Sequence, residues 1–434
     1  MLNATSTPDQ APLPFWKAKR RNIILLLFAA GIINYADRVN MSIAAPKIAE
    51  HFGWDPATMG ILMSSFLWTY VIFLVPMGYF TDKYGARRVN AVGLSVWSLA
   101  AMATGVVGGF TTMLLARLVL GAGESSTWPS SGKIIRRWFP SSERGIVSTI
   151  FQASGNFGPA VAMPFVAWLV VTAGWRLSFI ITGALGFIWL FFWIKYYKEP
   201  AQCSWLPEDE KTFLLANTDQ DIGDAAQVKP QGLILKLLSQ KTVWGLAIAQ
   251  GCLAYTQYLI LTWLPSYLVQ AKDMQLMKAS MFSAAAFLFA TIINVLAGKF
   301  SDAVLTPEKV SQGHRRTMVI FFMLMTLSVG LISVVENQWL IFLMTGCAIA
   351  FSTSAIGLNM ALTNDLVKDP AIVGSVFGLL ILGGNGLGMF APMLTGFIVK
   401  STGNFDSGFL LAGIILCFGA FINLTLTRKP ISLS

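Results

Sequence analysis

Long apolar runs separated by short polar segments dominate this chain. A helix needs about 20 apolar residues to cross the hydrocarbon core of a bilayer, and runs of about that length recur throughout the sequence. The twelve predicted spans lie near residues 22–46, 57–81, 89–110, 112–135, 145–170, 177–197, 242–268, 277–299, 317–335, 338–364, 371–399 and 407–427. The pattern predicts an all-α integral membrane protein with twelve transmembrane helices.

One polar segment, Pro200 to Gln240, is much longer than the others and separates six spans from six. Inside it, the acidic run that follows Pro207 predicts the start of a short surface helix. The predicted domains are an N-terminal tail (1–20), a six-helix bundle (21–199), a linker (200–240), a second six-helix bundle (241–428) and a C-terminal tail (429–434).

The two halves share sequence landmarks. The loop Gly78–Asp82 after the second span returns as Gly298–Asp302 after the eighth, and Pro46 of the first span has a counterpart in Pro265 of the seventh. Both correspondences have nearly the same offset, which indicates a duplication. A repeat of this kind predicts two pseudo-symmetric bundles with a binding site at their interface, near mid-membrane.

Composition and charge agree with this class. Of the 434 residues, 55% are hydrophobic and 12% are charged, a balance unsuited to a soluble domain. Most of the 31 Lys and Arg residues fall on the side of the membrane that carries the tails and the linker, which predicts that both termini are cytoplasmic. Basic inner loops facing anionic lipid account for the net charge of +10 without any role for nucleic acid.

Cysteine and histidine show no pattern of a metal or redox centre. The 4 cysteines have no paired spacing, and the 2 histidines fall in loops on opposite predicted sides of the membrane. We expect the cysteines to be core residues, and we expect no metal, no cofactor and no enzymatic activity.

Four ionisable residues lie well inside the apolar spans: Asp37 and Arg38 in the first, and Arg117 and Glu124 in the fourth. Such residues are costly in a bilayer and usually functional. Seven residues of helix rise about 10.5 Å, so Arg117 and Glu124 share a face but cannot touch. The guanidinium therefore needs another anion, and a carboxylate substrate would supply it through a bidentate contact. A structural ion-pair network that also includes Arg38 is the alternative.

Several segments resemble a known family. The loop Gly78–Arg88 is similar to the glycine, aspartate and basic-residue signature of major facilitator transporters. Within that superfamily, Tyr35–Asn40, the run Arg117–Glu124 with Pro129, and Trp138–Gly145 resemble the anion:cation symporter family. Members of that family carry organic anions, including the sugar acids galactonate, glucarate and the hexuronates. The resemblance covers nearly the whole chain outside the tails and the linker.

The resemblance implies roles for the buried charges. Arg117 would bind the anion, and Asp37 and Glu124 would carry protons. Burial favours the protonated carboxyl group, whereas a nearby arginine favours the carboxylate. When an anion occupies the arginine, the acid loses that cation and takes up a proton, so substrate and proton enter together.

Neutral polar groups complete the predicted site. In the second bundle, buried amides must find partners, either a substrate or a neighbouring helix; both readings stay open for each residue. The predicted substrate-binding residues besides Arg117 are Tyr35, Tyr70, Asn156, Gln250, Asn359 and Asn385.

The signature loop predicts gate residues at the cytoplasmic surface: Asp82, Arg87, Glu143 and Arg144. We expect Asp82 to accept hydrogen bonds from a helix N-terminus and Arg87 to pair with Glu143. Glycine and proline in spans five and eleven, at Ser154–Pro159 and Gly383–Gly388, serve either as hinges or as close helix contacts.

The sequence therefore predicts a proton-coupled symporter of a small organic anion in the inner membrane, acting as a monomer by alternating access. Its partners are that anion, protons and the lipid bilayer. The near alternative is a sodium-coupled or facilitative carrier, and the distant one is a sensor derived from a transporter. The response of uptake to pH and sodium gradients separates these classes.

Overall fold

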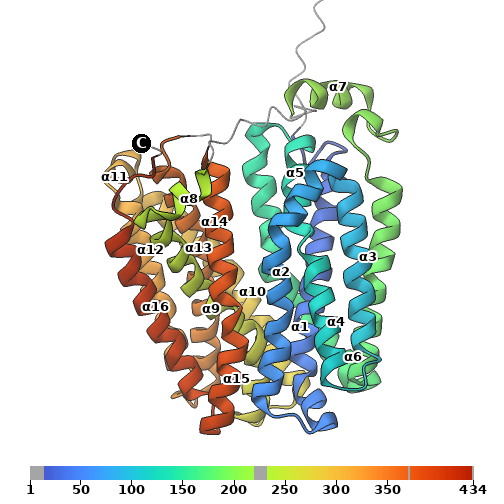
Figure 1. Ribbon diagram of the computed structural model, residues 1–434, viewed down its shortest axis with the longest axis vertical. Helices are drawn as coiled ribbons and strands as arrows, with labels where there is room; N and C mark the ends of the chain where they lie inside the picture. The colour runs from blue at the N-terminus through green and yellow to red at the C-terminus, as the bar shows by residue number, and fades with distance from the viewer. Residues whose placement is uncertain (1–13, 219–231, 370–371, 433–434) are drawn as a thin grey trace, which may run out of the picture.

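The computed structural model describes residues 14–218, 232–369 and 372–432, and within them the chain is helical, with no strand beyond one isolated bridge between Val367 and Ile431. Two helical bundles lie side by side (Figure 1). Most of the N-terminal tail, part of the linker and the first residue of the eleventh predicted span lie outside the described residues.

All six spans of the N-terminal bundle are present, although their helices do not match them one to one. Two serines, at 125 and 126, divide the fourth span, and spans five and six form one continuous helix except at Gly174, whose positive φ of 83° marks the turn between them. The helices are α1 (Arg21–Phe52), α2 (Pro56–Tyr84), α3 (Ala86–Thr104), α4 (Phe110–Glu124), α5 (Thr127–Trp138) and α6 (Ser141–Tyr196).

The C-terminal bundle contains the other six spans. The ninth span ends in the 3₁₀ helix η2 (Thr326–Leu331), and the eleventh is divided at Met389. Its α-helices are α9 (Lys241–Gln270), α10 (Leu276–Val304), α11 (Pro307–Ser311), α12 (His314–Met325), α13 (Gln338–Leu366), α14 (Val373–Gly388), α15 (Phe390–Thr402) and α16 (Asp406–Leu426), of which α11 is a short surface turn.

Seven stretches of the described chain are long and apolar enough to cross a membrane as single helices, and one of them, α6, holds two spans. The remaining spans are interrupted by breaks or polar residues, as at Arg117 and Glu124 in α4. The prediction of an all-α, twelve-span fold in two bundles is confirmed.

The same packing recurs in both bundles at the glycine-rich segments. In α6, a Cβ on Gly158 would lie 2.8 Å from the Cβ of Tyr35 in α1. In α14, a Cβ on Gly388 would lie 2.7 Å from the Tyr258 ring in α9, and one on Gly384 would lie 2.9 Å from Gln250. Span five therefore packs on span one as span eleven packs on span seven. These glycines make the close contacts that the packing alternative requires.

The linker contains η1 (Pro200–Gln202), the predicted surface helix α7 (Glu208–Asn217) and α8 (Leu233–Leu238). In Figure 1, α7, α8 and the C-terminus lie at the same end of the bundles, which we call the linker end; the opposite end is the far end. A buried guanidinium, Arg20, holds α7 in place: it lies 2.8 Å from a Glu143 oxygen and 3.2 Å from a Glu210 oxygen. The tail, α6 and α7 therefore meet at one arginine.

Replacing Arg20 with Ala is expected to destabilise the protein by about 2 kcal/mol. Breaking a fully buried ion pair costs about 3–5 kcal/mol, and the partial exposure of both carboxylates reduces that figure. Thermal unfolding of the purified protein measures the change. Arg21→Ala is the matched control, because the Arg21 side chain makes an exposed bond to the Trp16 carbonyl. Equal melting temperatures for the two variants would contradict this account of the linker.

The bundles touch each other directly in the half of the membrane at the far end. Lys400 Nζ of α15 lies 2.6 Å from Asp55 Oδ2, beside the start of α2. Gly60 and Gly396 allow the two backbones to approach, because a Cβ on Gly60 would lie 3.1 Å from the Gly396 Cα. The hydroxyl of Ser64 also donates to a backbone carbonyl of the other bundle. In Figure 1, α15 approaches α2 at this end.

Asp55 serves two elements at once, since it also caps α2 by accepting the Thr58 amide at 2.8 Å. The hydrogen bond from Lys400 and, after it, the one from Thr58 lower the pKa of Asp55 to about 2. The contact is therefore complete above about pH 4, the ordinary range for aspartate, and is lost as the pH falls through about 2.

Asp55→Asn is expected to shift the balance of conformations a few-fold away from far-end contact, because asparagine keeps the helix cap but loses a surface ion pair of modest strength. Distances between spin labels at Glu50 and Asn404, one on each bundle, report the change. Lys400→Gln should have the same effect. The wild-type distances should be equal at pH 7 and pH 5. Unchanged distances in both variants would show that the ion pair between Asp55 and Lys400 does not stabilise this conformation.

Candidate functional site

A buried ion pair joins the first and fourth spans. Arg38 of α1 donates from Nε to Glu124 Oε2 at 2.8 Å, and its Nη2 lies 2.8 Å from the same oxygen. The Glu124 side chain is fully buried. Its second oxygen, Oε1, has no hydrogen-bond partner among the described residues. The Asn34 side chain is near enough to interact with this carboxylate, and Oε1 is the oxygen that is not held by Arg38.

Three aromatic rings surround the Arg38 guanidinium: Phe66 at 4.9 Å, Tyr70 at 5.0 Å and Tyr35 at 5.2 Å from the ring centroids. Such faces stabilise a cation by their quadrupoles and keep it dehydrated. The cage restrains the guanidinium, and the Tyr70 side chain also interacts with it through its hydroxyl. Two of its rings, Tyr35 and Tyr70, are predicted substrate-binding residues.

Arg117 is 2% exposed, and its Nε and Nη1 have no hydrogen-bond partner in the described part of the chain. Its guanidinium carbon lies 5.3 Å from the centroid of the Phe66 ring. Phe66 is therefore shared by both arginines. As the spacing predicted, Arg117 does not bond to Glu124. A buried guanidinium with unused donors is costly and well suited to receive an anion.

Asp37 precedes Arg38 by one residue in α1 and is 1% exposed. Among the residues the structure describes, neither of its carboxyl oxygens makes a hydrogen bond of good geometry, although the Thr182 side chain is near enough to interact with the carboxyl group. It interacts electrostatically with Glu124 and Arg117. The predicted proton carriers and the predicted anion ligand therefore form one electrostatic cluster.

A cavity of about 70 Å³ lies between the bundles next to this cluster. From the N-terminal bundle, Tyr35 and Asn156 line it, and from the C-terminal bundle, Gln257 and Tyr258 do so. The space equals that of about two water molecules, and we call it the polar corner. Two predicted substrate-binding residues, Tyr35 and Asn156, thus reach the bundle interface.

Asn385 lies behind this corner. Its Oδ1 accepts the Tyr258 hydroxyl at 2.8 Å, and its Nδ2 donates to the Ile381 carbonyl at 3.0 Å. Asn385 therefore orients Tyr258, which lines the cavity itself.

Gln250 and Asn359 occupy a different environment. Asn359 donates to Gln250 Oε1 at 2.9 Å and to the Leu246 carbonyl at 3.0 Å, and it accepts Asn423 at 3.3 Å. Asn359 is fully buried and Gln250 nearly so. This network bonds α9, α13 and α16 to one another. The geometry therefore favours the helix-packing alternative for both residues over the ligand role.

The predicted gate residues lie at the linker end, but two of their contacts differ from the prediction. Glu143 bonds Arg20, and Arg87 donates to the Ile194 carbonyl at 2.8 Å. The predicted ion pair between Arg87 and Glu143 is wrong for this conformation, because each side chain is bonded to a different partner.

Asp82 accepts Lys133 Nζ of α5 at 3.3 Å rather than a helix N-terminus. The same ammonium donates to the Thr81 carbonyl at 3.1 Å, so Lys133 caps the end of α2. Arg144 performs the equivalent task for α5, donating to the Phe139 carbonyl at 3.0 Å. These contacts join neighbouring helices of the N-terminal bundle.

The sequence interpretation omitted two residues from the site, Arg38 and Tyr258. Arg38 had been considered only as part of a structural network, although its position one residue after Asp37 places it about 100° around the helix, on a face that meets the fourth span. Tyr258 was one of several polar residues in the seventh span, with no local signal to distinguish it. Among the described residues, no group of three His, Cys, Asp or Glu side chains could hold a metal ion.

Two pseudo-symmetric bundles with ionisable groups buried around their interface define an integral membrane transport protein, not an enzyme. The family model of the Major Facilitator Superfamily matches residues 27–309 and 279–433. The chain belongs to that superfamily.

Relatives that are named as transporters are similar over almost their whole length. The probable galactarate/D-glucarate transporter GudP of Escherichia coli is 31% identical over 426 residues, which cover 95% of this chain and 92% of that protein. The hexuronate transporter of Bacillus subtilis is 31% identical over 94% of this chain and 95% of its own.

Solved structures share the fold at lower identity. A bacterial homolog of the human lysosomal transporter Spinster, inward-facing and occupied, has a TM-score of 0.72 and 17% identity over 96% of this chain and 99% of its own. The D-xylose-proton symporter has a TM-score of 0.73 and 15% identity over 94% of this chain and 98% of its own.

Proposed function

We propose that this protein is a proton-coupled symporter of a small organic anion, of the sugar-acid class, that works by alternating access. The observation that carries the proposal is Arg117, a buried guanidinium with unused donors beside two carboxyl groups. A carboxylate substrate would satisfy those donors through charge-assisted bonds. A purely structural arginine would instead be bonded within the fold.

Coupling would follow from competition for Arg38. In the structure its donors hold Glu124. An arriving carboxylate that attracts Arg38 leaves Glu124 buried without its cation, and a buried carboxylate without a partner takes up a proton. Asp37 is buried, its carboxyl oxygens make no hydrogen bond of good geometry among the described residues, and it is the second proton carrier. The anion and the proton would then cross the membrane together, bound to the same carrier.

The sugar-acid class is supported by the relatives, which are named as galactarate/D-glucarate and hexuronate transporters. Hydroxyl groups of such a substrate would bond to the polar corner made by Tyr35, Asn156, Gln257 and Tyr258. Because that corner holds about two waters, a sugar acid requires the bundles to move apart around it.

The direction of movement follows from the contacts. The bundles meet at the far end through Asp55 and Lys400, so this conformation would be the one closed to the outside. The excess of Lys and Arg at the linker end supports cytoplasmic termini in a bacterial inner membrane. Rocking about the central site would break the far-end contacts and open the site outward.

Uptake of radiolabelled D-glucarate into proteoliposomes tests the proposal. An inward proton gradient should drive accumulation in the absence of sodium. Accumulation driven by sodium alone would favour the sodium-coupled alternative, equilibration without accumulation would favour a facilitative carrier, and binding without uptake would favour a sensor. A parallel thermal-shift screen with sugar acids, aromatic acids and dicarboxylates identifies the preferred anion.

A further inference from the structure

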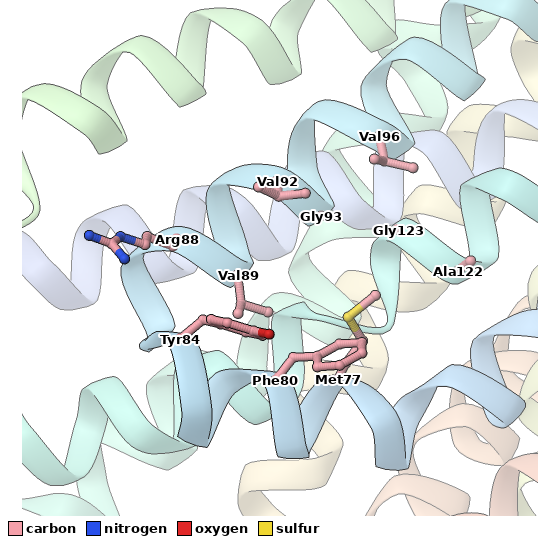
Figure 2. Close-up of a pocket in the computed structure, with 10 residues that line it drawn as sticks. All are labelled: Met77, Phe80, Tyr84, Arg88, Val89, Val92, Gly93, Val96, Ala122 and Gly123. Atoms are coloured by element: carbon pink, nitrogen blue, oxygen red, sulfur yellow. The ribbon is translucent and has the colours of Figure 1, made fainter.

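A long apolar groove of about 490 Å³ opens on the outer surface of the N-terminal bundle. Figure 2 shows its walls: Met77, Phe80 and Tyr84 project from α2, and Val89, Val92 and Val96 from α3. The volume falls within the range of ligand pockets. Since this surface faces lipid in a transport protein of this fold, the natural occupant is a hydrocarbon chain.

Close helix packing shapes the floor of the groove. A Cβ on Gly93 of α3 would lie 2.7 Å from the Cβ of Ser126, just after α4, and 2.8 Å from the Gly123 carbonyl of α4, so α3 packs closely against the end of α4 beneath the groove. From Arg88 to Val96 the α3 helix rises about 12 Å. One leaflet of the hydrocarbon core is about 15 Å thick, so the groove is as deep as most of one leaflet.

The mouth of the groove, at the linker end, is cationic. Arg88 lines it and is exposed, and the ammonium of Lys83 lies 5.3 Å from the ring of Tyr84, another lining residue. Among the described residues neither cation forms an ion pair or a hydrogen bond, in contrast to Arg87, which is bonded to Ile194. The two side chains would lie at headgroup depth, where a phosphate could receive them.

A second groove provides an internal comparison. It lies on the C-terminal bundle, has a volume of about 460 Å³, and is lined by Leu324, Met325, Leu327, Ser328, Leu331, Leu343, Met344, Cys347 and Phe351. None of these side chains is charged. The two grooves are therefore similar in size, but only the groove on the N-terminal bundle has a cationic residue, Arg88, in its lining.

We propose that the groove between α2, α3 and α4 is a binding site for one anionic phospholipid of the leaflet at the linker end, with an acyl chain along Phe80 and Val92 and the phosphate at Arg88 and Lys83. The site involves none of the transport residues and does not depend on the proposed substrate. Because the lipid would contact α2 and α3 together, it would stabilise this helix pair, which includes Asp82 in the last turn of α2.

Native mass spectrometry of the purified protein, supplied with phosphatidylglycerol or with phosphatidylcholine of the same chains, tests the site. The wild type should retain one phosphatidylglycerol per chain, with about tenfold preference over phosphatidylcholine. Arg88→Gln should abolish the preference, and Val92→Trp, which fills the groove from an exposed position, should abolish retention. Lys299→Gln at the end of α10 and Leu343→Trp in the uncharged groove are the matched controls and should behave as wild type.

Each other outcome overturns the proposal. Equal retention of the two lipids would exclude recognition of an anionic headgroup. Retention unchanged in both Arg88→Gln and Val92→Trp would place the lipid elsewhere. A wild-type dimer that Val92→Trp converts to a monomer would assign the groove to a second copy of this chain. Size-exclusion profiles of the variants confirm that they are folded.

Discussion

Glu124→Gln is expected to abolish proton-driven accumulation of the substrate while exchange of substrate across the membrane continues. Glutamine has nearly the shape of the protonated acid but cannot exchange a proton, so Arg38 is left permanently without its carboxylate partner. The variant would mimic the protonated carrier, which binds the anion and moves between its two orientations. Uptake into proteoliposomes under a pH gradient should fall to the equilibrium level, and counterflow of labelled substrate should remain within about threefold of wild type.

Glu336→Gln is the matched control, because Glu336 is exposed in a loop at the far end, and its uptake should equal that of wild type. Asp37→Asn should resemble Glu124→Gln if both acids carry protons. Full accumulation in the Glu124 variant would exclude that residue from coupling. Loss of both accumulation and exchange, with normal thermal stability, would assign it to substrate binding instead.

Arg117→Ala is expected to weaken anion binding by at least about 100-fold. A charge-assisted bidentate contact is worth about 3 kcal/mol, and each 1.4 kcal/mol is a factor of ten in Kd. Arg117→Lys keeps the charge but not the planar pair of donors, so its affinity should be intermediate. Isothermal titration of the purified variants with D-glucarate, or with the best ligand of the screen, gives the three dissociation constants.

The unliganded stability of the Arg117 variants separates binding from folding. Removing a buried, unpaired guanidinium relieves a desolvation cost of about 2.5–3.5 kcal/mol, so Arg117→Ala should melt at or above the wild-type temperature. Lys278→Ala, at an exposed position of α10, should change neither affinity nor stability. Normal affinity in Arg117→Ala would exclude that residue as the anion ligand.

Much of the fold could be predicted because hydropathy and charge bias are properties of whole segments. The span count, the central linker and the surface helix after Pro207 all follow from runs of residues. Helix breaks were not predictable in the same way. The division at Ser125 and Ser126 depends on local backbone geometry, and the turn at Gly174 joins two spans without a polar loop.

The site was predictable only where the residue type alone indicates a free-energy cost in the membrane. Asp37, Arg117 and Glu124 stand out because a bilayer disfavours charge wherever it occurs. The sequence does not show that Arg38 is the partner of Glu124, because Arg38 lies on another helix, 86 positions earlier in the chain. Asn359 is a similar case. From the sequence its amide could bind a substrate, and only its hydrogen bonds to Gln250 and Asn423 show that it joins helices.

In the proposed mechanism, Glu124 takes up a proton when the anion binds at Arg117 and Arg38. Proton uptake during substrate binding, measured as the pH change of a weakly buffered solution of the purified protein near pH 8, tests it most directly. The account predicts uptake of at least about half a proton per D-glucarate bound by wild type, and a clearly smaller uptake by Glu124→Gln at equal saturation. Anion binding by wild type without proton uptake would contradict it.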